Sequence, residues 1–163
     1  MKIIYLHGFN SSSKSKKAQI LKNSKAIKNL GFEINLIDLP NSPYKAISEI
    51  EKVIKNDSKD TSLIGSSLGG FYASYLSDKY NLKSVTINPV ISLHLEKMKD
   101  LIGPQVNYHS NEEYEFTNEM FNELLTLKVK ILREPLNHFC LVKLNDQVLD
   151  HKKTISYFDK AIM

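Results

Sequence analysis

The stretch Leu63-Ile64-Gly65-Ser66-Ser67-Leu68-Gly69-Gly70-Phe71 decides the fold of this 163-residue chain. It contains the pattern G-x-S-x-G, which places a serine on a strained strand-to-helix turn and needs glycines where a side chain would clash. An apolar pair, Leu63-Ile64, precedes the pattern, and helical spacing follows it up to Tyr80. Ser67 occupies the middle of the pattern and is the candidate nucleophile. Ser66 is the alternative serine, and a plain strand–helix connection is the alternative interpretation.

Short apolar runs and helical repeats alternate along the rest of the chain. The runs that predict strands cover residues 2–6, 33–39, 61–65, 84–87 and 139–144, and helical spacing covers residues 18–30, 46–54, 69–80 and 152–161. This alternation predicts an α/β fold with a mostly parallel sheet flanked by helices. The polar segment at about 89–127 breaks the rhythm. We therefore expect one domain over residues 1–163 with a lid-like insertion across one end of the sheet.

A second loop agrees with the serine pattern. His7-Gly8-Phe9 directly follows the first apolar run, so it lies at the carboxyl end of the first strand, the edge where open α/β sheets bind ligands. In hydrolases with an H-G motif this loop supplies one backbone N–H of the oxyanion hole, and the residue after the nucleophile supplies the other. We assign these roles to Phe9 and Leu68. For His7 we favour an orienting hydrogen bond within its own loop over a role as general base.

Charge and composition narrow the choice of partners. The net charge is +4, but the basic residues are scattered lysines with Arg133 as the only arginine, which favours a solvated surface over nucleic-acid binding. No segment approaches the roughly 20 apolar residues of a membrane span, and the apolar run at the start is too short for a signal peptide. Cys140, the single cysteine, lies in an apolar run that predicts a buried thiol. We expect a cytoplasmic protein with neither nucleic acid nor membrane as partner.

Several blocks of the chain together resemble one known family, the YqiA/YcfP-like esterases of the α/β-hydrolase superfamily. The matching blocks are residues 5–12 and 65–73, Asn88-Pro89, Leu101-Ile102-Gly103 with Asn107-Tyr108, and Asp146-Gln147-Val148-Leu149-Asp150. The resemblance implies a small carboxylic-ester hydrolase that acts on short or medium acyl esters or thioesters without a metal or an organic cofactor. A non-catalytic acyl-binding or scaffold protein on the same fold is the alternative.

The resemblance also implies the acid of a catalytic triad. Asp146 follows the last predicted strand and fits the chain order Ser…Asp…His, so it is the candidate that would orient the histidine. Asp150 is the weaker candidate, and a turn or helix-capping aspartate is the alternative for both. Asn145 stands where the family usually has glycine, so we expect an altered turn before Asp146.

The family's catalytic histidine lies in a Gly-Gly-x-His-type loop after one more strand. This sequence ends at Met163, where that strand would begin, so we expect the final strand and helix to be missing, through truncation or natural degeneration, and one sheet edge to be open to a second copy. His94 and His109, in the insertion, are the candidate stand-ins, although a surface position is favoured for both. His138 precedes a strand, near the wrong end of the sheet, and His151 follows Asp150 too closely to face it.

The insertion is also expected to shape the acyl pocket. Tyr108, Tyr114 and Phe116 are the candidate lining residues, with ordinary packing aromatics as the alternative.

Overall fold

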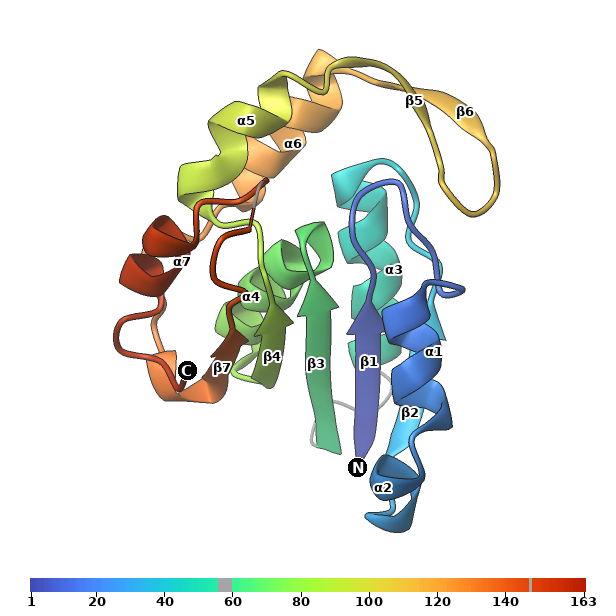
Figure 1. Cartoon of the computed structure of the whole chain (residues 1–163), viewed down its shortest axis with the longest axis vertical. Helices are drawn as coiled ribbons and strands as arrows, with labels where there is room; N and C mark the ends of the chain where they lie inside the picture. Colours follow the sequence, from blue (N-terminus) through green and yellow to red (C-terminus); the bar gives the residue numbers. More distant parts are fainter. Residues whose placement is uncertain (56–59, 147) are drawn as a thin grey trace.

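A computed structural model describes residues 1–55, 60–146 and 148–163, so Gln147 of the resembling block lies outside the described residues. Its centre is a parallel sheet of β1 (Lys2–Leu6), β2 (Glu33–Ile37), β3 (Thr61–Ser66), β4 (Lys83–Ile87) and β7 (His138–Leu141). The strand order is β2-β1-β3-β4-β7, and every neighbouring pair is parallel (Figure 1). The predicted α/β class with a parallel sheet is confirmed.

Helices flank this sheet much as the apolar spacing predicted. They are α1 (Lys16–Asn23), α2 (Lys25–Asn29), α3 (Pro43–Lys55), α4 (Leu68–Tyr80) and α7 (His151–Tyr157). The single helix expected over residues 18–30 is divided in two, because Ser24 adopts an extended conformation and caps α2 by accepting the Ile27 N–H. A serine with helical neighbours thus ends one helix and begins the next.

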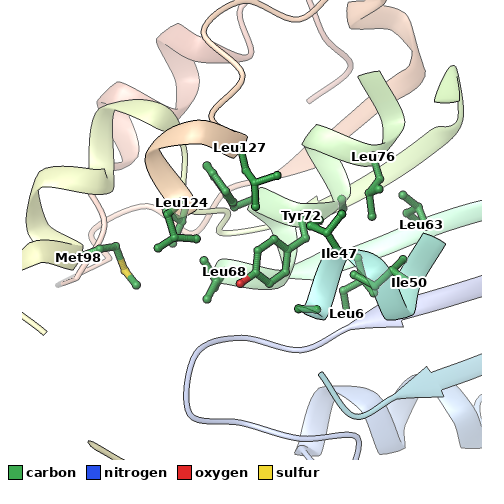
Figure 2. Packing of buried hydrophobic residues seen from close by; sticks show 14 of the residues in the cluster. Leu6, Ile47, Ile50, Leu63, Leu68, Tyr72, Leu76, Met98, Leu124 and Leu127 are labelled. Carbon is green, nitrogen blue, oxygen red and sulfur yellow. The ribbon is translucent and has the colours of Figure 1, made fainter. Parts of the chain in front are cut away.

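The hydrophobic core lies between the sheet, α3 and α4. Figure 2 shows side chains from β1, β3, α3 and α4 gathered in one cluster, among them Leu6, Leu63, Ile50 and Leu76. All four of these side chains are fully buried. Their burial fixes α4 against β3 and β4, and therefore fixes the turn from β3 into α4 that carries Ser67.

The topology creates a crevice beside that turn. The chain places β2 on one side of β1 and β3 on the other, so loops leaving β1 and β3 diverge at their carboxyl ends. Such a switch point is where open α/β sheets bind ligands. Leu6 pairs with Gly65 in the register of β1 and β3, and this brings the His7-Gly8-Phe9 loop next to Ser67.

Residues 89–127 form a cap over the carboxyl ends of the strands (Figure 1). The cap contains a short 3-10 helix (Ser92–His94), α5 (Leu95–Lys99), α6 (Asn118–Leu127) and an antiparallel hairpin of β5 (Gly103–Val106) and β6 (Glu113–Phe116). The Glu123 carboxylate on α6 accepts hydrogen bonds from the Ser42 hydroxyl and the Tyr44 N–H, which ties the cap to the start of α3. The sequence indicated helical parts here but not the hairpin.

The outer edge of β7 is only partly paired. A second 3-10 helix (Pro135–Asn137) leads into β7, which ends at Leu141 instead of the predicted residue 144. Ile162 forms one parallel bridge with Phe139, donating to the His138 carbonyl and accepting from the Cys140 N–H. Phe139, Leu141 and Ile162 are 37%, 43% and 52% exposed, so this edge presents apolar side chains to solvent.

Candidate active site

Ser67 sits on a strained turn between β3 and α4. Its φ of 54° and ψ of −120° lie in a region that L-residues rarely adopt. Four backbone hydrogen bonds hold it there: the Ser67 N–H donates to the Ile87 carbonyl, and the Ser67 carbonyl accepts from the N–H groups of Gly70, Phe71 and Val90. Ser66, by contrast, is the last residue of β3 and is buried. The structure therefore presents Ser67, not Ser66, at the tip of the turn.

Two glycines of the pattern are required by close backbone approach. A Cβ on Gly65 would lie 2.2 Å from the Gly69 carbonyl oxygen, and one on Gly69 would lie 2.1 Å from the Leu6 carbonyl oxygen. Both distances are far below a van der Waals contact, and the opposing atoms are backbone. These glycines let the start of α4 pack directly on β1 and β3.

The His7-Gly8-Phe9 loop lies against the serine. A Cβ on Gly8 would lie 3.2 Å from Ser67 Cβ and 3.7 Å from Ser67 Oγ. The Phe9 and Leu68 N–H groups have no hydrogen-bond partner among the residues that the structure describes. Phe9 and Leu68 also line one small cavity of about 20 Å³. Two unpaired amide groups beside a strained serine are the arrangement that can bind a developing oxyanion.

His7 is fully engaged in holding this loop. Its Nδ1–H donates to the Gly8 carbonyl and its Nε2 accepts from the Leu39 N–H, each at 2.9 Å, and these two bonds assign the tautomer. The side chain is buried, and burial lowers the pKa of His7. A neutral ring with both nitrogens occupied orients the loop, as the sequence suggested, and has no lone pair left to act as a base.

Asp146 lies at the same edge of the sheet, after β7. Its Oδ1 accepts the Val148 and Leu149 N–H groups at 2.9 Å, and its Oδ2 accepts the Asn88 side-chain amide at 3.2 Å. The hydrogen bond from the Leu149 N–H is the main cause that lowers the pKa of Asp146. The carboxylate is thus ionised at neutral pH and fixed beside Asn88 at the end of β4.

The turn before Asp146 needs no glycine. Asn145 adopts a φ of 60°, the left-handed conformation that asparagine tolerates better than most residues. The chain thus makes a left-handed turn before Asp146 without a glycine at position 145. Asp150 is a helix-capping aspartate, which was the alternative to a catalytic role: its carboxylate accepts the Lys152 N–H and caps α7.

The histidines of the cap differ from each other. The surface position expected for His94 is wrong: it is 1% exposed, with Nδ1 accepting from the Ile91 N–H and Nε2 facing the Asp150 carbonyl at 3.2 Å. Burial lowers the pKa of His94, so it is a structural residue that ties the cap to the start of α7. His109 is exposed at the turn of the β5–β6 hairpin and lines the cleft beside His7.

The remaining histidines lie away from the serine. His138 is the first residue of β7, at the amino end of the sheet, where its Nδ1 pairs with the Ser84 hydroxyl at 2.9 Å. His151 begins α7. Within the described part of the chain, no histidine is hydrogen-bonded to Ser67 or to the Asp146 carboxylate.

Asn10 lies within the resembling block of residues 5–12, but the sequence predicted no role of its own for it. It is buried with a φ of 52°, and it links the His7-Gly8-Phe9 loop to the hairpin. Its Oδ1 accepts from the Tyr114 hydroxyl at 2.6 Å, its Nδ2 donates to Gln105, and its carbonyl accepts from the Tyr108 N–H. The only feature of the sequence that could have indicated this role of Asn10 is its position directly after His7-Gly8-Phe9.

The three aromatic candidates of the insertion have different environments. Tyr114 lines the small cavity with Phe9, and Phe116 is buried with its ring 5.3 Å from that of Phe9. Tyr108 is 75% exposed and lines neither this cavity nor the cleft beside His7. Only Tyr114 is thus placed to contact a bound group.

Other kinds of site have little support in the described residues. Cys140 is buried, as expected, and burial raises the pKa of its thiol. Residues 1–55, 60–146 and 148–163 contain no cluster of three or more histidine, cysteine or acidic side chains suited to a metal ion. None of the helices in these ranges has the length and apolarity needed to cross a membrane.

Comparisons with known sequences identify relatives over nearly the whole chain. The family model described as "Uncharacterised protein family (UPF0227)" matches residues 2–163. A UPF0227 protein of Vibrio atlanticus is 31% identical over 159 residues, which is 94% of this chain and 80% of the relative. A UPF0227 protein of Vibrio campbellii is 30% identical over 163 residues, which is 97% of this chain and 83% of the relative.

Solved structures share the fold at low sequence identity. Alpha/beta hydrolase domain-containing protein 10 from mouse superposes with a TM-score of 0.75 at 13% identity, covering 99% of this chain and 76% of that protein. The monoacylglycerol lipase of Paleococcus ferrophilus superposes with a TM-score of 0.71 at 14% identity, covering 98% and 79%. Est1E from Butyrivibrio proteoclasticus follows with a TM-score of 0.68 at 12% identity, covering 99% and 75%. The fold is thus that of the α/β hydrolases.

Proposed function

Because the chain belongs to the UPF0227 family and has an α/β-hydrolase fold, we propose that it is a serine hydrolase of carboxylic esters or thioesters, with Ser67 as nucleophile. One observation carries the proposal: Ser67 is held at positive φ between two amide groups, of Phe9 and Leu68, that have no partner among the described residues. A strand-to-helix connection with no chemical role would not need this strain. The names of two structural neighbours, a lipase and Est1E, agree with this class of reaction.

The proposed reaction has two steps, acylation of Ser67 and hydrolysis of the acyl-enzyme. Ser67 Oγ attacks the acyl carbon while its proton passes to a base, and the carbonyl oxygen becomes an oxyanion that accepts hydrogen bonds from Phe9 and Leu68. The leaving alcohol or thiol departs with a proton, and water then releases the acid from Ser67 by the same path. Each amide donor stabilises the transition state by roughly 2.7–4 kcal/mol.

No histidine among the described residues is hydrogen-bonded to Ser67, so the base has to come from a side chain that is not in contact with Ser67 in this structure. His7 and His94 have both ring nitrogens engaged, which leaves His109 as the histidine with a free ring in the neighbouring cleft. The ionised Asp146 is suited to orient an imidazole ring through a hydrogen bond. Without a base in place, the oxyanion hole and substrate binding alone would still give a rate roughly 10³–10⁴ over that in water.

The test is hydrolysis of p-nitrophenyl acetate by the chain and by two matched variants. Ser67→Ala should abolish turnover while the far-UV spectrum stays unchanged. Ser66→Ala, one residue earlier and buried at the end of β3, should retain it. Turnover that survives in Ser67→Ala would refute the assignment of the nucleophile.

A second candidate function is binding of an acyl compound without turnover. It is favoured by the absence, in the described ranges, of any histidine hydrogen-bonded to Ser67. The same assay separates the two functions. A folded chain that binds a short-chain ester but hydrolyses it no faster than Ser67→Ala would support the second, and clear turnover would exclude it.

A further inference from the structure

The β5–β6 hairpin of the cap is attached to the loop after β1. It extends from the cap toward the β1 side of the sheet (Figure 1). Among the residues that the structure describes, every hydrogen bond from residues 103–116 to a residue outside the cap ends at Asn10 or Ser11. The Tyr108 N–H donates to the Asn10 carbonyl, and the Asn107 side-chain amide donates to the Ser11 carbonyl, each at 2.9 Å. The hairpin is thus hydrogen-bonded to the body of the protein at one place.

The same attachment supports the backbone around Phe9. The backbone groups of residues 9–11 form no other hydrogen bond within the described ranges. On one side of this segment, His7 holds the carbonyl of the preceding residue, and on the other side the Ser13 N–H donates to Asp38. Between these two fixed points, the path of the chain depends on its bonds to the hairpin.

The Asn10 side chain connects to both strands of the hairpin. Gln105 on β5 donates through its Nε2 to the Leu101 carbonyl, which can only accept, so the Gln105 Oε1 accepts from Asn10 Nδ2. Asn10 Oδ1 is therefore the atom that accepts from the Tyr114 hydroxyl on β6, at 2.6 Å. Asn10 is buried, so water has little access to replace these partners. The bonds leave the Asn10 amide with a single orientation.

Aromatic packing joins Phe9 itself to the same hairpin. The Phe9 ring meets the rings of Phe116 and Tyr114 edge to face, with centroids 5.3 Å and 6.4 Å away. Phe9 follows Gly8, where an added Cβ would lie 3.2 Å from Ser67 Cβ. The side chain of Phe9 and the residue after it are therefore both held by the hairpin, at a place next to the serine.

We infer that Asn10 and Tyr114 are positioning residues, through which the hairpin sets the place of the Phe9 N–H against Ser67. The inference rests on the proposed hydrolase function and adds to it a part of the cap that acts on an oxyanion donor. Such a donor is effective only where the oxyanion will lie, and a misplacement of about 1 Å can lower the rate on the order of 10²-fold. A group that acts through the donor changes the reaction of a bound ester, not its binding.

The test compares two tyrosines that each lose only a hydroxyl. Tyr114→Phe removes the bond to Asn10 Oδ1 but keeps the ring that packs on Phe9. Tyr44→Phe is the matched control: Tyr44 is 46% exposed near the start of α3, and its hydroxyl has no hydrogen bond among the described residues. A urea titration of each variant establishes that it is folded under the conditions of the measurements.

NMR relaxation of the backbone amides gives a readout that needs no turnover. In the unmodified chain the Phe9 amide should have the order parameter of a rigid backbone, about 0.85. In Tyr114→Phe it should fall toward the flexible range, below about 0.6, while the Leu68 amide stays rigid. Tyr44→Phe should change neither amide.

Hydrolysis of p-nitrophenyl acetate gives the second readout. Tyr114→Phe should lower kcat about tenfold and change KM less than about twofold, because the displaced donor acts in the transition state. Tyr44→Phe should leave both constants unchanged. Because the Tyr114 hydroxyl acts through Asn10, the double variant Asn10→Gly/Tyr114→Phe should be no slower than Asn10→Gly alone. Glycine adopts the φ of 52° readily, so Asn10→Gly removes the side-chain bonds without backbone strain.

Three results would overturn the inference: a Phe9 amide that stays ordered in Tyr114→Phe, one that is already mobile in the unmodified chain, or an effect on turnover through KM alone. Loss of order at Phe9 in a chain that hydrolyses no ester would refute only the proposed function, and the coupling of the hairpin to Phe9 would stand. Turnover that requires Ser67 but is unchanged in Tyr114→Phe, with Phe9 still ordered, would refute only this inference.

Discussion

Asn10 and Tyr114, 104 positions apart in the sequence, form the shortest described hydrogen bond between the loop after β1 and the cap, from the Tyr114 hydroxyl to Asn10 Oδ1 at 2.6 Å. Asn10 adds a second bond through its Nδ2 to Gln105 and a third through its carbonyl to the Tyr108 N–H. The residue next to Phe9 is thus held by both strands of the hairpin. The position of the Phe9 N–H depends on a segment far along the chain.

Replacing Asn10 should weaken the fold at this junction. Asn10→Ala removes two side-chain bonds, leaves the half-buried Tyr114 hydroxyl without its acceptor, and disfavours the φ of 52°. We expect a loss of about 2–4 kcal/mol in the free energy of unfolding, measured by urea titration. Asn111→Ala is the control, because Asn111 has a similar φ of 56° but is exposed. Equal losses in both variants would mean that the side-chain bonds contribute nothing.

The backbone conformation of Ser67 should lower the free energy of unfolding of the protein. Its φ of 54° and ψ of −120° are accessible to glycine at little cost but strain any residue with a Cβ. Ser67→Gly should therefore raise the free energy of unfolding by about 1–3 kcal/mol. Ser66→Gly, in the regular strand β3, should lower it. If both variants are destabilised, the serine conformation is not strained.

The local part of the site could be predicted because its determinants are adjacent in sequence. The glycines that flank Ser67 indicate a tight strand-to-helix turn, and the His7-Gly8-Phe9 sequence directly follows a predicted strand. Both features can be recognised from a few neighbouring residues. The register of β1 and β3 then brings them together. For the same reason the parallel sheet followed from the alternation of apolar runs and helical spacing.

The cap could not be predicted in the same way because long-range contacts stabilise it. The β5–β6 hairpin is polar and short, and part of its stability comes from Asn10, nearly a hundred residues earlier. His94 is buried because its Nε2 meets the Asp150 carbonyl across the fold, a contact without any local signal. Such partners are known only once the chain has folded.

Stability should fall when the pH is lowered through the range of histidine titration. Burial lowers the pKa of His7, His94 and His138 in the folded state below the ordinary value of about 6.5. Between the folded and unfolded pKa values the unfolded chain binds more protons, so acidification favours unfolding. The urea midpoint should be constant above about pH 7 and decrease from there to pH 5.5. A midpoint that rises over this interval would contradict the burial of these rings.

The His138→Gln variant isolates one of these contributions. His138 is buried at the start of β7, and its Nε2 has no partner among the described residues. Its protonated form would place an unpaired charge inside the protein. The variant should lose less stability than the unmodified chain between pH 7 and pH 5.5, again by urea titration. An identical loss would assign the effect to the other two histidines.

The outer edge of β7 should bring two copies of the chain together. Phe139, Leu141 and Ile162 are exposed apolar side chains on an edge with only one described bridge, and such an edge offers free backbone groups to another strand. We propose a concentration-dependent dimer through this edge, detectable by sedimentation equilibrium. Leu141→Lys should weaken the association, because a charged side chain on an edge opposes pairing. Leu30→Lys is the matched control: Leu30 is 72% exposed but follows α2, outside β7. A chain that stays monomeric at all concentrations, or one that both variants weaken equally, would refute pairing at β7.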